Sequence, residues 1–150
     1  YFNRVAALSA ICEDLPELHN AVTLDPDLVD SDGIPAPKVT YTLGDNTRNM
    51  LQHGVERASE ALRAAGAHDI IVQSPLPNAG WHLLGTARMG VDPEHSVVNE
   101  WGRSHDVKNL FIVDGSIFVT AAGVNPTPTI QALALYIAEQ MKNRLANLFD

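Results

Sequence analysis

The sequence predicts an α+β fold with strands and two helices, and three features support this prediction. Residues 21–24 and 38–43 are rich in β-branched and aromatic side chains, and the second segment alternates with the period of a half-buried strand. Turn-forming residues at 30–33 separate the two segments. After Gly44 the apolar residues recur at the spacing of a helix, and a second, long helix is expected to begin near Pro126.

Both predicted helices have start signals and an apolar face. Asp45 or Asn46 can accept hydrogen bonds from the free amides at the start of the first helix, and Gly66 can end it in a left-handed conformation. Thr127 or Thr129 is the start signal of the second helix. The apolar face of the first helix consists of Leu51, Val55, Ala58 and Leu62. That of the second consists of Ile130, Leu133, Ala134, Ile137, Met141 and Leu145.

Three other segments are predicted to be extended. Residues 68–73 form a short strand, and the loop after it leads to Trp81 and His82. Residues 97–98 are a strand-like pair. Residues 109–114 are almost wholly apolar, as in a strand that is buried on both faces of a sheet.

The composition excludes several classes of function. A net charge of −8 opposes binding to the phosphate backbone of a nucleic acid. No run approaches the roughly 20 apolar residues that a membrane-spanning helix needs. The single cysteine, Cys12, excludes an intramolecular disulfide and is expected to be a small buried apolar residue. The histidines show no spacing typical of metal ligands, so no metal site is expected.

Two residues could take part in chemistry, and each has a structural alternative. His82 lies among apolar neighbours, where burial would keep the imidazole neutral and available as a proton acceptor. It could equally be a core histidine bonded to the backbone. Asn125 precedes Pro126, which holds it out of the helical region at the start of the following helix. A helix cap with no further role would explain Asn125 equally well.

Four blocks of the sequence resemble the carboxy-terminal signature of the glucose-methanol-choline (GMC) oxidoreductases. The blocks, which occur in the family's order before an alanine-rich helix, are residues 82–90, 96–99, 109–116 and 125–127. Residues 1–81 resemble the end of that family's substrate domain more loosely, mainly through residues 33–41. Within the family, the chain resembles bacterial sugar, polyol and gluconate dehydrogenases.

The resemblance implies the oxidation of an alcohol, with a sugar or polyol as substrate. In this family a hydride moves from the alcohol carbon to the flavin while a base removes the hydroxyl proton. His82 matches the family's catalytic histidine and would be that base. Asn125 matches a second active-site position, where it would hydrogen-bond the hydroxyl and the developing alkoxide. Arg88 is expected to be structural.

The resemblance also implies contacts to FAD. Asp114 and Gly115 match the family's contact with the ribityl and pyrophosphate region of the flavin. Asn125, Pro126 and Thr127 would lie by the isoalloxazine ring. The family's main FAD anchor, a Gly-x-Gly-x-x-Gly turn, has no counterpart in this sequence. Tight binding of FAD is therefore expected to need the amino-terminal half of such an enzyme.

The resemblance divides the chain at residue 81. Residues 1–81 would be part of the substrate domain, which is an antiparallel sheet with packed helices. Residues 82–150 would be the catalytic segment with the last strand and helix of the FAD-binding domain. The chain does not begin with Met and is expected to be a piece of a longer enzyme, inactive by itself, whose partner is the missing half or a second copy. The alternative is a non-enzymatic truncated module that acts through dimerisation or protein binding.

Overall fold

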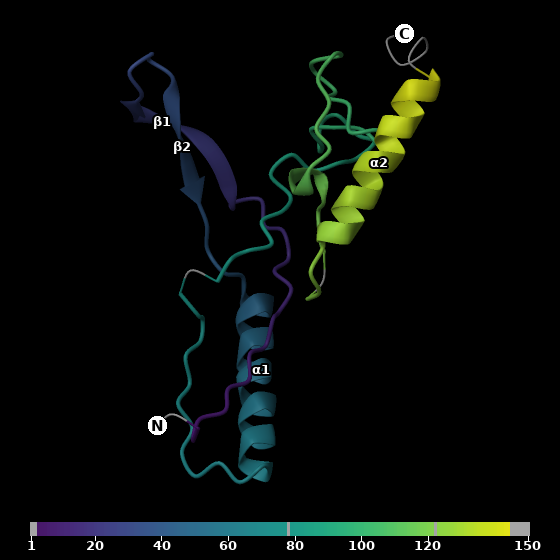
Figure 1. Cartoon of the computed structure of the whole chain (residues 1–150). Coiled ribbons are helices and arrows are strands. Elements are labelled where there is room, and N and C mark those ends of the chain that lie inside the picture. The colour runs from purple at the N-terminus through teal and green to yellow at the C-terminus, as the bar shows by residue number, and fades with distance from the viewer. Residues whose placement is uncertain (1–2, 78, 122, 145–150) are drawn as a thin grey trace. The chain divides into compact units, whose positions relative to one another are not determined.

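The computed structural model describes residues 3–77, 79–121 and 123–144. Its elements in chain order are β1 (Ala21–Val29), β2 (Pro35–Thr40), α1 (Asp45–Ala64), the 3₁₀ helix η1 (Gly115–Ile117) and α2 (Thr127–Arg144) (Figure 1). These elements confirm the α+β class. Among the described residues, no helix is both long enough and apolar enough to cross a membrane.

The chain forms two compact units that alternate along the sequence. The first unit consists of Tyr1–Leu15, Leu43–Gly80 and Ala122–Val124. The second consists of Pro16–Thr42, Trp81–Ala121 and Asn125–Asp150. The first unit therefore contains α1, and the second contains the sheet, η1 and α2. The expected domain boundary at residue 81 stays a prediction.

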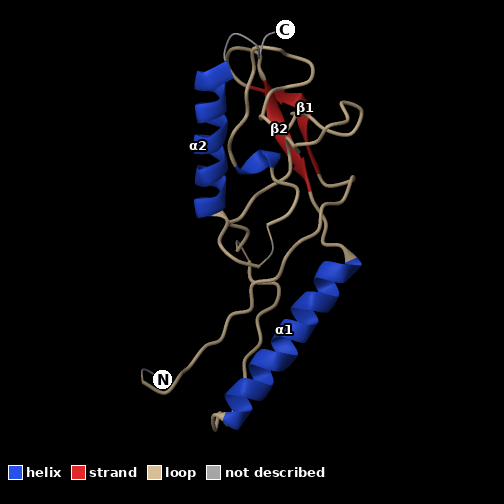
Figure 2. Ribbon diagram, turned by 90° about the vertical axis from the view of Figure 1, so that its right-hand side faces the viewer, coloured by secondary structure: helices blue, strands red, loops and turns tan. Residues whose placement is uncertain are grey.

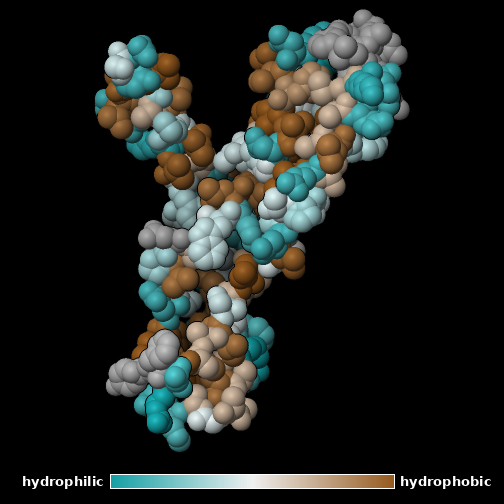
Figure 3. Space-filling view, viewed as in Figure 1, coloured by the Kyte–Doolittle hydropathy of each residue, from teal (hydrophilic) through white to brown (hydrophobic). Residues whose placement is uncertain are grey.

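The two strands of the second unit form an antiparallel hairpin, as predicted. Val22 lies opposite Val39, and both side chains are largely exposed, so the hairpin presents apolar surface (Figure 3). The second strand ends at Thr40, earlier than expected, because a side chain replaces the ladder beyond it. Asn20 accepts from the amide of Thr42 at 2.8 Å and donates to its carbonyl at 3.0 Å.

Helix α1 has the predicted apolar face but a different start. The side chains of Leu51, Val55, Ala58 and Leu62 are all half-buried. The expected capping by Asp45 or Asn46 is wrong, because the residue before the first helical turn is Gly44, which has no side chain to accept a hydrogen bond. The predicted end is confirmed, since Gly66 has a φ of 94°.

Two of the predicted strands are absent from the described residues. Residues 68–73 pair with no other segment, and Ile71 is 98% exposed. Residues 109–114 form one isolated bridge, between Phe111 and Arg103, because a tight turn from Val107 to Leu110 occupies the start of the run. A strand needs a neighbouring strand with which to form a ladder of backbone hydrogen bonds, and among the described residues neither segment has one. The pair 97–98 likewise forms only isolated bridges, at Val98.

The core of the second unit forms where α2 packs on η1 (Figure 2). Val98, Ile117 and Ile137 are fully buried there. Partly buried residues that pack around them are Met89, Ile112, Val113, Phe118, Leu133 and Met141. The predicted face of α2 is confirmed from Ile130 to Met141, and Leu145 lies outside the described residues.

The core can be tested with two substitutions in α2. Ile137 is 0% exposed, so Ile137→Ala is expected to lower the free energy of unfolding by about 2–5 kcal/mol. Leu135, on the same helix, is 73% exposed, and Leu135→Ala should change it by no more than about 0.5 kcal/mol. Urea unfolding followed by circular dichroism measures both, and equal losses would contradict this core.

Candidate functional site

The segment that contains His82 alternates between exposed and half-buried side chains. Trp81 and Leu83 are 72% and 82% exposed, whereas His82 and Leu84 are half-buried. This alternation is that of an extended chain, in which successive side chains point to opposite sides. His82 therefore lies on the same side of the segment as Leu84, which packs against Gly115.

Backbone hydrogen bonds anchor the residues that follow His82. The amide of Ala87 donates to the carbonyl of Ser116, and the amide of Met89 donates to that of Ile117, both at 2.9 Å. Gly85, with a φ of 84°, turns the chain close to the carbonyl oxygen of Phe118. The residues after His82 thus run along η1.

Arg88 is structural, as the sequence predicts. Its Nε donates to the carbonyl of His95 at 2.6 Å, and its own carbonyl accepts from the amide of Val97 at 2.9 Å. These bonds hold the loop of residues 91–96 closed. The side chain of Arg88 therefore stabilises the backbone of this loop.

Asp114 lies at the start of η1 with its carboxylate exposed. Its Oδ1 accepts from the amide of Ser116 at 2.7 Å. Hydrogen bonds from the Ser116 side chain and then from its backbone amide lower the pKa of the Asp114 carboxyl below its ordinary value. The site thus has an ionised carboxylate at the end of the apolar run.

Gly115 is the point at which the predicted site segments meet. A Cβ on this residue would lie 3.1 Å from Leu84 Cδ2 and 3.2 Å from Ile130 Cδ1, and 3.4 Å from the carbonyl oxygen of Leu83. The chain after His82, the start of η1 and the first turns of α2 therefore approach one another closely here. Such a close approach accommodates glycine and leaves little room for a larger side chain.

The start of α2 presents hydrogen-bond donors. Pro126 is buried, and its carbonyl accepts from the amide of Ile130 at 3.0 Å, whereas Asn125 and Thr127 are exposed. The amides in the first turn of a helix have no acceptor within the helix, and proline at position 128 has no N–H. The backbone amides of Thr127 and Thr129 thus remain as donors, beside the Asn125 side chain.

The structure brings the segments of all six predicted site residues together in one unit. His82, Asp114, Gly115 and residues 125–127 all belong to the second unit, and contacts around Gly115 join their segments. Within the described residues, no hydrogen bond links the side chains of His82 and Asn125. The roles of base and positioner stay predictions.

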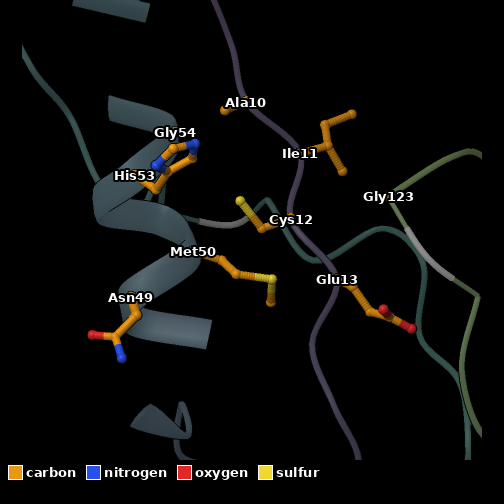
Figure 4. Close-up of a pocket in the computed structure, with 9 residues that line it drawn as sticks. All are labelled: Ala10, Ile11, Cys12, Glu13, Asn49, Met50, His53, Gly54 and Gly123. Carbon is orange, nitrogen blue, oxygen red and sulfur yellow. The ribbon is translucent and has the colours of Figure 1, made fainter. Parts of the chain in front are cut away.

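A groove in the first unit contains none of these residues. It has a volume of about 600 Å³ and lies between residues 10–13 and one face of α1 (Figure 4). The side chain of Cys12 points toward α1, and the side chain of Met50 points from α1 toward the opposite wall. Cys12 is half-buried in this wall, where the sequence predicted a buried residue.

Comparison with known proteins shows the family of the chain. The family profile described as GMC oxidoreductase, for the carboxy-terminal part of these enzymes, matches residues 16–134. The chain belongs to the GMC oxidoreductases. This family consists of FAD-binding oxidoreductases that act on CH–OH groups.

Two relatives and one solved structure illustrate the similarity. The 2-methyl-1,2-propanediol dehydrogenase of Mycolicibacterium austroafricanum is 47% identical over 92% of this chain and 25% of its own length. The fructose dehydrogenase large subunit of Gluconobacter japonicus is 36% identical over 89% of this chain and 24% of its own length. The predicted resemblance to bacterial polyol and sugar dehydrogenases is confirmed, and the chain spans about a quarter of these relatives.

The structural comparison supports the fold. The crystal structure of pyridoxine 4-oxidase from Mesorbium loti matches 76% of this chain and 26% of that protein, with a TM-score of 0.57 and 22% sequence identity. At this identity the likeness shows the fold alone. The chain thus has the fold of part of a GMC oxidoreductase.

The residues around Gly115 fit FAD, the cofactor of this family. The exposed Asp114 carboxylate can accept from hydroxyl groups such as those of a ribityl chain. The Asn125 amide and the free amides at the start of α2 can donate to an electron-rich ring edge, and the helix dipole adds a positive field. The acceptor Asp114 precedes Gly115, and the donors lie at the start of α2, which Gly115 contacts through Ile130.

The effect of Ser116 on the pKa of the Asp114 carboxyl can be tested with Ser116→Ala. This change removes the side-chain donor and keeps the backbone donor, so the pKa of the Asp114 carboxyl is expected to rise toward its ordinary value. A carboxylate with a lowered folded-state pKa stabilises the fold above its unfolded pKa, and this contribution disappears as the pH falls through the folded value. The Ser116→Ala variant should therefore lose this contribution to stability at a higher pH than the unaltered chain. A carboxyl-carbon NMR titration measures the pKa, and an unchanged value would contradict a role for the side chain.

Proposed function

We propose that this chain is the carboxy-terminal catalytic segment of an FAD-dependent alcohol oxidoreductase, with His82 as the base and Asn125 as the positioner. The main support is the packing of Gly115 against Leu84 and Ile130. It joins the segment of a half-buried histidine to exposed hydrogen-bonding groups at the start of a helix. This proposal includes residues 1–81 as part of the substrate domain and residues 82–150 as the catalytic segment.

The proposed substrate is a sugar or another polyol. One relative is named for a diol and another for fructose, and both compounds carry hydroxyl groups on carbon. Leu84 lies on the same side of the extended segment as His82, and its half-buried side chain would give apolar surface beside the reacting carbon. The exposed Asn125 would supply the polar contact to the hydroxyl.

In the proposed reaction the alcohol loses a hydride from its carbon and a proton from its hydroxyl group, and each goes to a different acceptor. Bound FAD would supply the acceptor for the hydride that leaves the carbon. The imidazole of His82 accepts the hydroxyl proton, so that the developing negative charge stays on the oxygen for only part of the reaction. The side-chain amide of Asn125 donates to that oxygen and stabilises this charge.

The chain's own residues would hold one part of the cofactor. Asp114 would accept from its hydroxyl groups, and Gly115 would let it approach the backbone closely. Buried Pro126 fixes the start of α2, so that Asn125 and Thr127 would meet the ring edge. The sequence has no glycine-rich turn for the pyrophosphate, so tight binding would need the amino-terminal half of the enzyme.

The role of His82 is tested in the complete enzyme. His82→Ala is expected to lower turnover of the alcohol roughly 100-fold or more, because general base catalysis is lost, while FAD stays bound. His68→Ala is the matched control, because His68 is exposed and lies in the first unit. Steady-state kinetics and the flavin absorption spectrum measure both effects, and near-normal turnover in His82→Ala would refute the base.

The need for a further half is tested by adding FAD to the purified chain. We expect weak binding by the chain alone and stoichiometric binding once the amino-terminal half is present, since the pyrophosphate anchor lies there. Flavin fluorescence and the visible spectrum measure the bound fraction. Tight binding by the chain alone would contradict this expectation. Failure of both forms to bind FAD would favour the alternative, a non-enzymatic module that acts through dimerisation or protein binding.

A further inference from the structure

The second unit contains the same five-residue turn twice. In the hairpin, Oδ1 of Asp30 accepts from the amides of Asp32 and Ile34, both at 2.9 Å. The amide of Asp30 donates to the carbonyl of Ile34 at 3.0 Å, and its carbonyl accepts from Gly33 at 3.1 Å. Gly33 has a φ of 80°, so the turn is closed by one side chain and one glycine.

Residues 99–103 repeat this pattern bond for bond. Oδ1 of Asn99 accepts from the amides of Trp101 and Arg103, at 2.9 and 3.1 Å. The amide of Asn99 donates to the carbonyl of Arg103, and its carbonyl accepts from Gly102, both at 2.9 Å. Gly102 has a φ of 67°. The two turns thus share their geometry, with Asn99 in the place of Asp30.

The two turns differ in what lies beside the glycine. A Cβ on Gly33 would meet no atom within 4 Å. A Cβ on Gly102 would collide with the carbonyl oxygen of Ile112, and the amide of Ile112 donates to the carbonyl of Gly102 at 2.7 Å. The first turn only closes a hairpin, whereas the second is packed tightly against another segment.

The second turn thereby fixes the chain that leads to Asp114. Besides the bond at Ile112, the amide of Ser104 donates to the carbonyl of Leu110 at 2.9 Å. Nε of Arg103 donates to the carbonyl of Lys108 at 2.8 Å. Residues 108–112 are therefore tied to this turn at three points, and Asp114 follows two residues later. Because residues 108–112 belong to no regular strand, these bonds set the position of that segment.

We propose that Asn99 and Gly102 are positioning residues, which hold residues 110–113 so that Asp114 and Gly115 meet the cofactor. This inference rests on the proposed function of the site. The turn at residues 99–103 thus has a role that the turn at residues 30–34 lacks, because Gly102 contacts the segment before Asp114 and Gly33 does not.

The first test compares the acceptors of the two turns in the complete enzyme. Asn99→Ala should raise the dissociation constant for FAD about tenfold, because two hydrogen bonds that hold the turn are lost. Asn99→Asp keeps the accepting oxygen and should restore binding to within about twofold. Asp30→Ala removes the same bonds from the hairpin turn and should lower the melting temperature without changing the dissociation constant. Flavin fluorescence and thermal unfolding measure the two quantities.

The second test compares the glycines. Gly33→Ala and Gly102→Ala impose the same left-handed strain, but only the second forces the carbonyl of Ile112 to move. Gly102→Ala should weaken FAD binding more than tenfold, and Gly33→Ala should leave it unchanged. If Gly102→Ala prevents folding, the Asn99 and Asp30 pair still decides the question.

The outcomes separate this inference from the proposed function. Equal effects of Asn99→Ala and Asp30→Ala on the dissociation constant, or no rescue by Asn99→Asp, would overturn the positioning role while the unaltered enzyme still binds FAD. An unaltered complete enzyme that binds no FAD would instead overturn the proposed function.

Discussion

The close packing around Gly115 is the constraint on which the candidate site depends. A side chain there would meet Leu84 and Ile130 within 3.2 Å, so the backbone of η1 lies directly against two other segments. Protein interiors have few voids, and this contact leaves the three segments little freedom to move apart. The bonds from Ala87 and Met89 to the carbonyls of η1 then fix the direction in which the chain leaves His82. One glycine thus brings together residues that lie far apart in the sequence.

Residues 81–114, which lead to this contact, contain no regular helix or strand among the described residues, and polar side chains there supply hydrogen bonds that a sheet would otherwise supply. Buried backbone groups need partners, and in residues 88–112 many of these come from polar side chains. Arg88 closes one loop through the carbonyl of His95, and Asn99 closes another through two amides. The hydroxyl of Ser104 accepts from the amide of Val107 at 3.1 Å. Such bonds make a loop-rich region specific in shape, and this is the property that a site built from loops requires.

The sequence predicted the elements whose cause is local and failed where the cause is a distant partner. The apolar faces of α1 and α2 follow from periodicity, and the left-handed Gly66 follows from the chemistry of glycine. The strand expected at 109–114 depended on neighbouring strands, and the bonds from Gly102 and Ser104 could not be read from composition. Burial suggested His82 and helix geometry suggested Asn125, but only the ordered resemblance to the GMC oxidoreductases linked them. The turn at Asn99 had a visible signal, an Asx residue three positions before a glycine, which the hairpin repeats at Asp30.

The charge distribution around Gly115 favours a ligand with two kinds of polar group. On one side, bonds from Ser116 keep the Asp114 carboxyl ionised to lower pH than usual, so this position accepts hydrogen bonds. On the other side, the first turn of α2 offers the backbone amides of Thr127 and Thr129 as donors, because these amides have no acceptor within the helix. A hydroxyl group can donate to the first position or accept at the second, whereas an anion can only accept at the second and is repelled by the first. A polyhydroxylated chain attached to an electron-rich ring, as in the proposed flavin, satisfies both positions, whereas a phosphate satisfies only the second.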